Sequence, residues 1–447
     1  MPAPGLTREI ERYVARTPKS RALQAEAADV LPGGSSRGTA YFAPYPFFAE
    51  AGEGHHVYDV DGNRYLDFML NATSLILGHG HPTIAEALGE QARKGTAFST
   101  PTTTQIRVAR LLRDRVPSLD TLRFTNSGTE GTLMAIRAAW AFTGKPMLAK
   151  FEGGYHGAHE HVAVSVRPPA AALDPAGPTP IPEYPGQPAG VGADVLVLPY
   201  NDLAECERRL RAHADRVGCL IMEPIVSSFG YLPGDPEFLR GIRKLTEELG
   251  IVLVYDEVQS LRVAPGGAQE LFGVTPDLTC FGKIIGGGMP VGAFGGRRDI
   301  MALFDPGAPG GARIAHAGTF NANPMTLVAG EAVLLAMTPA VYGRLADLGE
   351  RLRGKLRAAL GAAGVPAQVT GVASLFGIHF TPRPIRNYRD VVAGDAEMTR
   401  AVFTGLLNEG ILVQTSCAGS LGVMTTDTEI DTLADAVGRV AARVRQP

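Results

Sequence analysis

The chain has 447 residues, with 42 Lys plus Arg against 45 Asp plus Glu and a formal net charge of −3. This balance gives no electrostatic reason to expect a nucleic-acid or membrane partner. Hydrophobic residues make up 45% of the chain and charged residues 19%, which is typical of a soluble globular protein, and the length predicts two or three packed lobes.

The cysteines and the start of the chain bear on the compartment. The cysteines show no metal-ligand spacing and are too few for a disulfide framework, which favours a reducing compartment. They are Cys206, Cys219, Cys280 and Cys417. The N-terminal segment has no apolar core of the kind a secretory signal needs, and no apolar run reaches the roughly 20 residues that span a bilayer. We therefore expect a cytoplasmic protein.

The first part of the chain combines a helix with a hairpin. Residues 1–35 predict a polar helix that ends at a Pro-Gly-Gly break. In residues 56–68, two half-alternating runs flank Asp61-Gly62, a strong signal for a two-residue hairpin turn. From about residue 80 the pattern changes to helices that alternate with short apolar strands.

Residues 122–144 form the first segment with a chemical implication. A short strand, residues 122–125, leads through a glycine-containing turn into a run of good helix formers. Such a turn offers free backbone N–H groups and the positive end of a helix dipole to a phosphate, and the hydroxyls of Ser127 and Thr129 would add donors. Taken alone, an ordinary helix N-cap without a ligand is the simpler interpretation.

Residues 151–160, FEGGYHGAHE, form a second such segment. Two adjacent glycines let the backbone turn closely, and Tyr155 and His156 could lie flat on an aromatic ligand. His156 and His159 could also suggest a metal site. Their HxxH spacing lacks a nearby carboxylate pattern, however, so loop histidines are the better interpretation and we expect no metal.

Two apolar runs, residues 219–226 and 251–258, flank a helical pattern in residues 235–250. Asp235 suits the N-cap of this helix and Gly250 its C-cap. Apolar runs of this kind are typical of strands buried on both faces of a parallel sheet. The unit therefore predicts an α/β sheet.

Asp256 lies at the end of the second apolar run. Ligands of α/β proteins bind at the carboxyl ends of such strands. A carboxylate there faces a desolvation cost unless it meets a cation or donors, and a protonated pyridine nitrogen would satisfy that need. A capping or ion-paired aspartate is the alternative.

Lys283 follows another short apolar strand and precedes three glycines. Its neighbours Phe281, Ile284 and Ile285 are unusual for a surface lysine. Burial lowers the pKa of a lysine and makes its amine nucleophilic, which suits a covalent bond to a carbonyl cofactor. A lysine whose stem packs on apolar surface while its amine reaches water is the alternative.

The remaining segments define the domain organisation. Residues 168–192 are dense in Pro and Gly and predict a long surface loop. From about residue 325 the chain returns to amphipathic helices, and its last part mixes short strands with a final helix. We therefore expect an N-terminal segment in residues 1–70 that forms part of a small domain, a large domain in residues 71–325, and a smaller C-terminal domain in residues 326–447.

Taken together, these segments resemble the class III aminotransferases, pyridoxal-phosphate (PLP) enzymes of fold type I, from about residue 30 to the C-terminus. The signatures occur in the family's order: NSGTEGTLMAIR (126–137), KFEGGYHGAHE (150–160), LPYND (198–202), YDEV (255–258), PDLTCFGKIIGGGMPVGAFGGRRDIM (276–301) and HAGTFNANP (316–324). The resemblance is strongest to the branch of glutamate-1-semialdehyde aminomutase and the β-amino-acid and ω-transaminases. It implies an α/β fold whose large domain has a mostly parallel sheet flanked by helices, with a smaller α/β C-terminal domain.

The resemblance also implies the roles of individual residues. Lys283 holds PLP as a Schiff base and moves protons, and Asp256 pairs with the pyridine nitrogen. The other implied cofactor contacts are Ser127, Gly128 and Thr129 at the phosphate, Tyr155 over the ring, Val258 on its other face, and Glu223 near the cofactor hydroxyl. Thr319 resembles a threonine that reaches the phosphate of the neighbouring subunit, which implies a homodimer with shared active sites.

The family's reactions leave two main alternatives. Residues 256–263, DEVQSLRV, depart from the Met-Thr-Gly-Phe-Arg run usual in aminomutases, and residues 316–324 look more like β-phenylalanine transaminases. We therefore expect transfer of an amino group from an ω-amine or β-amino acid to a 2-oxo acid such as pyruvate. A glutamate-1-semialdehyde aminomutase is the alternative, which residues 198–202 and 282–298 favour. Another PLP reaction on this scaffold stays open.

The candidate substrate-binding residues lie in residues 33–48, a segment that also looks like the β-phenylalanine branch. There Arg37 is a candidate clamp for a substrate carboxylate, with a surface arginine as the alternative. Residues 411–424 lack the second arginine of some relatives. Arg37 or Arg262 would then serve acidic substrates, or the substrates lack an α-carboxylate. We expect Tyr41, with Phe42 and Tyr45, to line a pocket for aromatic or apolar groups.

Overall fold

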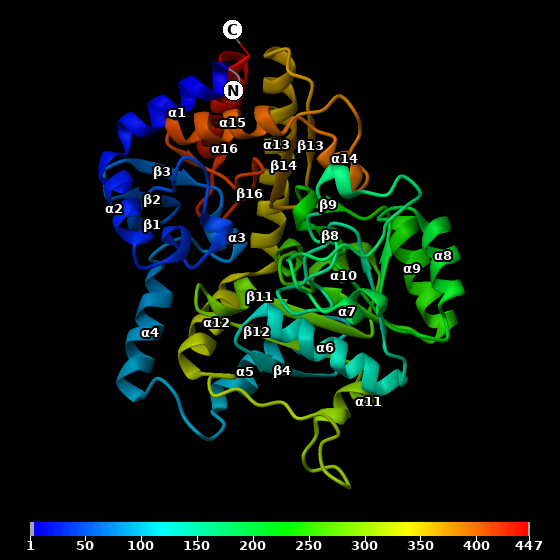
Figure 1. Cartoon of the computed structure of the whole chain (residues 1–447). Helices are drawn as coiled ribbons and strands as arrows, with labels where there is room; N and C mark the ends of the chain where they lie inside the picture. Colours follow the sequence, from blue (N-terminus) through cyan, green and yellow to red (C-terminus); the bar gives the residue numbers. More distant parts are fainter. Residues whose placement is uncertain (1–3, 446–447) are drawn as a thin grey trace. The chain divides into compact units, whose positions relative to one another are not determined.

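The computed structural model describes residues 4–445, which form two compact units (Figure 1). The central unit comprises Pro82–Arg344 and Ile385–Ala393. The terminal unit comprises the described residues up to His81, Leu345–Pro384, and the described residues from Gly394 onward. The two ends of the chain therefore contribute to the same unit.

A seven-stranded sheet with the order β4-β12-β11-β10-β7-β5-β6 forms the centre of the central unit. Its strands are β4 (Thr121–Thr125), β5 (Met147–Phe151), β6 (Val195–Leu198), β7 (Val217–Met222), β10 (Val252–Asp256), β11 (Leu278–Gly282) and β12 (Gly292–Gly296). Neighbouring strands are parallel from β6 to β11, and β12 runs antiparallel to both β11 and β4. The predicted α/β fold with a mostly parallel sheet is thus confirmed.

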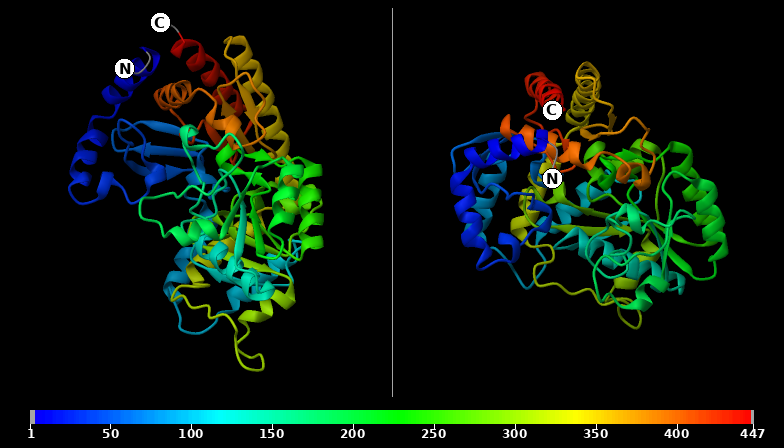
Figure 2. Two further views of the ribbon diagram at one scale, coloured as in Figure 1. Left: turned by 45° about the vertical axis from the view of Figure 1, so that its right-hand side comes forward. Right: turned by 45° about the horizontal axis from the view of Figure 1, so that its top comes forward.

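Both faces of this sheet are buried by helices. On one face α8 (Leu203–Ala212) and α9 (Pro236–Leu249), which lie side by side in Figure 1 and Figure 2, pack on strand residues such as Leu220 and Leu253. On the other face α6 (Gly128–Thr143) packs on their strand neighbours Ile221 and Val254. Successive strand residues point to opposite faces, so a strand covered on both sides must be apolar throughout.

The predicted helix in residues 235–250 is confirmed as α9. Pro236 occupies its first turn, and Gly250 ends it in the left-handed region at φ 63°. Asp235 occupies the predicted N-cap position, but its side chain makes no capping hydrogen bond. The carboxylate lies instead 3.5 Å from the Arg386 guanidinium.

Two other predicted elements are divided by proline. The run in residues 219–226 is not one strand: β7 ends at Met222, and β8 (Ile225–Val226) pairs with β9 (Leu232–Pro233) beyond Pro224. The predicted N-terminal helix is two helices, α1 (Pro4–Arg16) and α2 (Pro18–Ala28). Proline lacks an N–H and clashes with the preceding helical turn, which explains both breaks.

The other helices of the central unit lie between or beside these strands. They are α4 (Pro82–Lys94), α5 (Thr103–Arg113), α7 (Ala189–Ala193), α10 (Gly267–Phe272), α11 (Arg298–Met301), α12 (Pro324–Ala336) and α14 (Tyr388–Val392), with 3-10 turns at Ala170–Ala172, Ser227–Phe229, Ser260–Val263, Lys283–Gly286 and Ala302–Phe304. The predicted loop of residues 168–192 is mostly irregular, as expected. The Tyr388 hydroxyl anchors its start by donating to the Pro168 carbonyl at 2.8 Å.

The terminal unit contains two small sheets, with the strand orders β1-β2-β3-β15 and β13-β14-β16. Its strands are β1 (Ala49–Glu53), β2 (His56–Asp59), β3 (Arg64–Asp67), β13 (Gln368–Thr370), β14 (Leu375–His379), β15 (Ile411–Leu412) and β16 (Ala418–Ser420). Besides α1 and α2 its helices are α3 (Leu70–Thr73), α15 (Ala396–Asn408) and α16 (Asp427–Val444), with 3-10 turns at Pro32–Gly34 and Gly38–Ala40. The predicted hairpin around Asp61-Gly62 is confirmed, since β2 and β3 pair antiparallel. The two-residue turn is not, because the pairing of Tyr58 with Arg64 centres a longer connection on Asp61.

The boundaries of the units differ from the predicted domains. The large domain was expected in residues 71–325, whereas the central unit begins at Pro82 and runs to Arg344. The reason is α12, which packs against α4 and α5 rather than leaving the unit. Helix α13 (Pro339–Ala362) spans the boundary, and residues 385–393 return to the central unit, where Arg389 forms a bidentate ion pair with Glu152.

Across residues 4–445, no single helix has the length and apolar composition needed to cross a membrane. The bent pair α12 and α13, with 75° between its halves, meets the length and composition criteria only when the two are combined. No group of three His, Cys, Asp or Glu side chains within these residues is arranged to hold a metal ion.

Candidate active site

The predicted cofactor residues of the central unit gather at one edge of its sheet. Asp256 is the last residue of β10, whereas Glu223 directly follows β7 and Lys283 directly follows β11. These three strands are parallel. Tyr155 lies in the loop after β5, and the turn at Ser127 follows β4. The carboxyl ends of these strands meet at the same edge, where α/β proteins bind their ligands.

Asp256 is 5% exposed and is held by a histidine. The His156 Nδ1–H donates to Asp256 Oδ2 at 2.9 Å, and the Val258 N–H donates to Oδ1 at 3.1 Å. Burial lowers the pKa of His156 and outweighs the opposing effect of Asp256, so the imidazole is neutral near pH 7. Sequence reasoning considered His156 for ring stacking and missed this contact, because the pairing depends on the approach of two strands.

Glu223 is a second buried acid beside Asp256. Burial raises its pKa, and the charge of Asp256 raises it further. Three donors partly offset this: the Ser227 hydroxyl at 2.6 Å and N–H at 3.2 Å, and the Tyr155 N–H at 3.4 Å. Tyr155 is thereby fixed by its backbone, while its side chain stays 45% exposed.

The turn before α6 has the geometry of an anion site. Ser127 is the N-cap, and its Oγ accepts from the Glu130 N–H, so the interpretation as an N-cap is correct for this side chain. The first N–H groups of a helix have no partner within it and point towards its start. A Cβ on Gly128 would lie 2.9 Å from a methyl of Val258, and one on Gly157 would lie 2.7 Å from Thr129 Oγ1. Both glycines are therefore required for close packing around this turn.

Lys283 begins the 3-10 turn after β11 and is half-buried. Its backbone is left-handed at φ 51°, which is unfavourable for a residue with a Cβ. Strain of this kind persists where the surroundings fix it and is concentrated at functional sites. The neighbouring Ile284 and Ile285 are buried.

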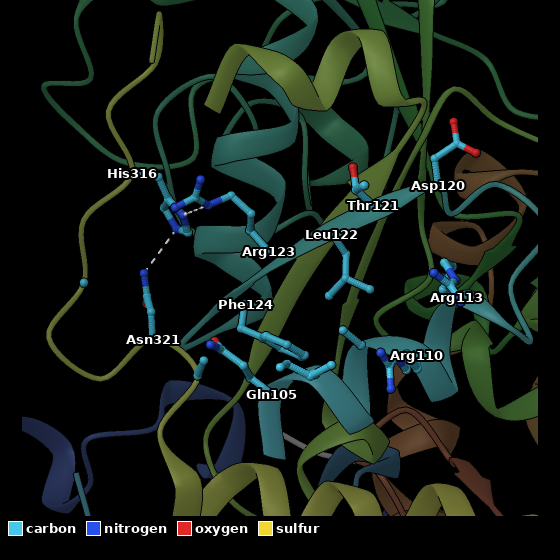
Figure 3. Close-up of a pocket in the computed structure, with 14 residues that line it drawn as sticks. Gln105, Arg110, Arg113, Asp120, Thr121, Leu122, Arg123, Phe124, His316 and Asn321 are labelled. Carbon is cyan, nitrogen blue, oxygen red and sulfur yellow. Dashed lines mark hydrogen bonds between the residues drawn. The ribbon is translucent and has the colours of Figure 1, made fainter. Parts of the chain in front are cut away.

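Thr319 lies in the exposed loop before α12. Gly318 and Asn321 of this loop line an open cavity of about 650 Å³ along the edge strand β4 (Figure 3). Arg123 of β4 donates to His316 at 3.1 Å, and His316 contacts the Asn321 amide at 3.2 Å. Asn321 in turn accepts from Asn126 at 2.9 Å. A chain of hydrogen bonds therefore joins the loop that contains Thr319 to the turn before α6 of the same subunit, where a phosphate is expected.

The predicted substrate residues Arg37 and Tyr41 belong to the terminal unit and are exposed. Arg37 Nη1 donates to Asn71 Oδ1 at 2.7 Å. The expected pocket is only partly available, because Tyr45 is 5% exposed and lies 3.0 Å from the Thr17 hydroxyl. Phe42 packs edge-on against Phe403, 5.0 Å between ring centroids.

The two candidate arginines for a substrate carboxylate differ in exposure. Arg262 is 1% exposed, and burial lowers its pKa to about 10. Arg37 is exposed.

Comparison with known proteins agrees with this fold and site. The chain matches the aminotransferase class-III family over residues 40–437. It is 44% identical to an ω-transaminase from Sphaerobacter thermophilus, with a TM-score of 0.92 over 97% of this chain and 100% of that one. A β-phenylalanine aminotransferase from Variovorax paradoxus gives 37% identity and a TM-score of 0.87 over 97% and 96%. A glutamate-1-semialdehyde 2,1-aminomutase from Methanothermobacter thermautotrophicus is 40% identical over 399 residues, 89% of this chain and 92% of that protein.

The chain therefore belongs to the class III aminotransferases and is a PLP-dependent enzyme. The residues present fit that cofactor. Asp256 is a buried carboxylate at this sheet edge that can accept from a ring N–H, and a helix N-terminus offers N–H groups to a phosphate. The glycines at 128 and 157 leave room that a side chain would fill.

Proposed function

We propose that this enzyme transfers an amino group from an ω-amine or β-amino acid with an aromatic or apolar side chain to a 2-oxo acid such as pyruvate. The observation that carries the proposal is the full-length likeness to an ω-transaminase, at 44% identity and a TM-score of 0.92. The likeness to a β-phenylalanine aminotransferase supports the aromatic substrate class.

In this proposal the sheet edge holds the cofactor. Ser127, Gly128 and Thr129 bind the phosphate with the α6 N-terminus. Tyr155 and Val258 would pack against the cofactor ring, and Glu223 would contact its hydroxyl group. Asp256 would accept a hydrogen bond from the protonated ring nitrogen, and His156 supplies the hydrogen bond that keeps this buried carboxylate in place.

Bound PLP supplies a carbonyl for the amine and a ring that withdraws electrons from the carbon next to it. The residue that moves protons is Lys283. Its Nζ removes the proton from the substrate carbon that bears the amino group. The protonated amine of Lys283 then donates this proton again as the amino group is transferred. The ionised Asp256 favours a protonated ring nitrogen, because an opposite charge at close range stabilises the charged form.

A second candidate function is the 2,1-aminomutase reaction of glutamate-1-semialdehyde, which the 40% identity to a curated aminomutase favours. The two reactions differ in whether the amino group leaves the molecule. An aminomutase converts its semialdehyde without an added acceptor, whereas a transaminase needs one.

We also propose that the enzyme is a homodimer with shared active sites. The open cavity beside β4 is lined in part by the exposed Ile106 (49%), and the loop that supplies Gly318 and Asn321 to it also carries the exposed Phe320 (58%). Exposed apolar groups around an open edge strand favour burial by another chain. Thr319, adjacent to Phe320, would then reach the phosphate of the other subunit.

The experiment is to supply purified, PLP-loaded enzyme with 1-phenylethylamine or β-phenylalanine and pyruvate, and to measure alanine by mass spectrometry. Alanine that requires both partners supports the proposal. Conversion of glutamate-1-semialdehyde to 5-aminolaevulinate without an acceptor, with no alanine from either amine, would replace it with the aminomutase.

A further inference from the structure

The segment after β3 has an unusual backbone. Leu70, Asn71, Ala72 and Thr73 all have positive φ, at 46°, 47°, 53° and 75°. In this region the Cβ of an L-residue crowds the following carbonyl, so such residues occur singly and are most often glycine or asparagine. Four in succession without a glycine require strong local support.

That support comes from Asp67, which is 4% exposed. Its Oδ1 accepts the N–H groups of Met69 and Leu70, both at 2.8 Å. Its Oδ2 is 2.8 Å from His79 Nε2. The carboxylate thus fixes the start of the left-handed turn and is itself fixed by a histidine on the following loop.

The turn presents one side chain, Asn71, in a defined orientation. Its Nδ2 donates to Ser74 Oγ at 3.1 Å, and Ser74 Oγ donates back to the Asn71 carbonyl at 2.9 Å. With its nitrogen used in this way, Asn71 directs Oδ1 to the Arg37 Nη1, 2.7 Å away. A guanidinium has five N–H donors, so Arg37 keeps others for a carboxylate.

We propose that Asn71 is a positioning residue that holds Arg37 ready to bind the carboxylate of the substrate, and that the left-handed turn Leu70–Thr73 exists to present it. This inference rests on the proposed function and on Arg37 as the carboxylate clamp expected from the sequence. An exposed arginine with many rotamers loses conformational entropy on binding, and a neutral acceptor reduces that loss without neutralising the charge.

The test compares substrates with and without a carboxylate. In Asn71→Gly the acceptor is lost but the left-handed backbone is relieved. We expect KM for β-phenylalanine to rise roughly tenfold, as for loss of a hydrogen bond to a charged group, while kcat and the kinetics of 1-phenylethylamine stay near wild type. Asn71→Asp keeps the fold and the acceptor oxygen but places a negative charge beside Arg37. It should therefore also raise KM for β-phenylalanine and leave KM for 1-phenylethylamine unchanged.

Ala72→Gly is the matched control, since it relieves the same turn and keeps Asn71. It should leave both substrates unchanged. Equal effects of Asn71→Gly on the two substrates would indicate a merely structural role and overturn the proposal, as would no effect on either.

A binding measurement separates this inference from the proposed function. Calorimetric titration of the PLP-loaded enzyme with 3-phenylpropanoate, which has the carboxylate but no amine, requires no turnover. Weaker binding in Asn71→Gly and Arg37→Ala than in wild type supports the inference even if no amine is transaminated. Unchanged binding in both variants, or none in the wild type, would contradict it.

Discussion

Burial of Asp256 removes water from a carboxylate, and the side chain that compensates is His156 at 2.9 Å. An acidic group at a strand end is a pattern that the sequence displays, so Asp256 and Lys283 could be proposed from their apolar flanks. His156 and Asn71 could not. Their partners are 100 and 34 residues away in the chain, and no local pattern encodes which side chain an approaching loop will meet.

His156→Ala should weaken PLP binding and turnover, because a buried carboxylate left without one of its donors costs about 1–3 kcal/mol. His156→Asn places an amide N–H near the former Nδ1 and should restore most of the loss. Cofactor affinity is measured by titrating the apoenzyme with PLP. Equal defects in the two variants would mean that ring packing, rather than the hydrogen bond, is what His156 provides.

At the scale of the elements, His159 in the loop after β5 makes the free energy of unfolding depend on pH. Burial lowers the pKa of His159 to about 4, with further lowering by His156, His161 and Arg137, against about 6.5 in an unfolded chain. Below pH 6.5 the unfolded chain binds the extra proton, so stability is full above this pH and falls as pH drops towards 4.

We predict a loss of no more than about 2 kcal/mol from this one group between pH 7 and pH 5. His159→Gln should fall less steeply over that range in urea unfolding. Parallel curves for wild type and variant would show that His159 titrates alike in both states.

Helix α6 offers a test of the phosphate turn with its own control. Gly157 and Gly144 both have positive φ, at 103° and 69°, but a Cβ on Gly157 meets Thr129, whereas one on Gly144 meets nothing within 4 Å. Gly157→Ala should displace Thr129 and weaken PLP affinity roughly tenfold or more. Gly144→Ala, at the far end of α6, should cost about 1 kcal/mol of stability and leave the affinity unchanged.

The elements also show where sequence reasoning succeeds. The helical spacing of apolar residues and the turn-forming residues predict α9, its glycine end and the Asp61-Gly62 hairpin, because these signals are local. The break of the apolar run at Pro224 is not evident from the apolar pattern alone, although a proline there excludes a continuous central strand. The extent of the central unit is not predictable in this way, because α12 is mostly apolar and only the assembled structure reveals that it packs against α4 and α5.

At the scale of the whole molecule, the shared-site dimer predicts complementation between two inactive chains. Lys283→Ala lacks the proton-transferring amine, and Thr319→Asp places a negative charge at the partner's phosphate. In a mixed dimer one site receives an intact Lys283 from one chain and an intact Thr319 from the other. Co-expression of the two variants should therefore recover about one quarter of wild-type activity, given random pairing of a two-fold dimer.

No recovery, with dimers demonstrated by sedimentation, would place Thr319 and Lys283 of each site on the same chain. A monomer in solution would remove the shared site altogether.

The central claim is that the amino group passes from one molecule to another. The most direct measurement supplies β-phenylalanine labelled with heavy nitrogen, together with unlabelled pyruvate, and follows the label by mass spectrometry. The account predicts that the heavy nitrogen appears in alanine in proportion to the donor consumed. Label that never reaches alanine, while unlabelled glutamate-1-semialdehyde is isomerised without any acceptor, would contradict it and identify an enzyme that moves the amino group within a single substrate.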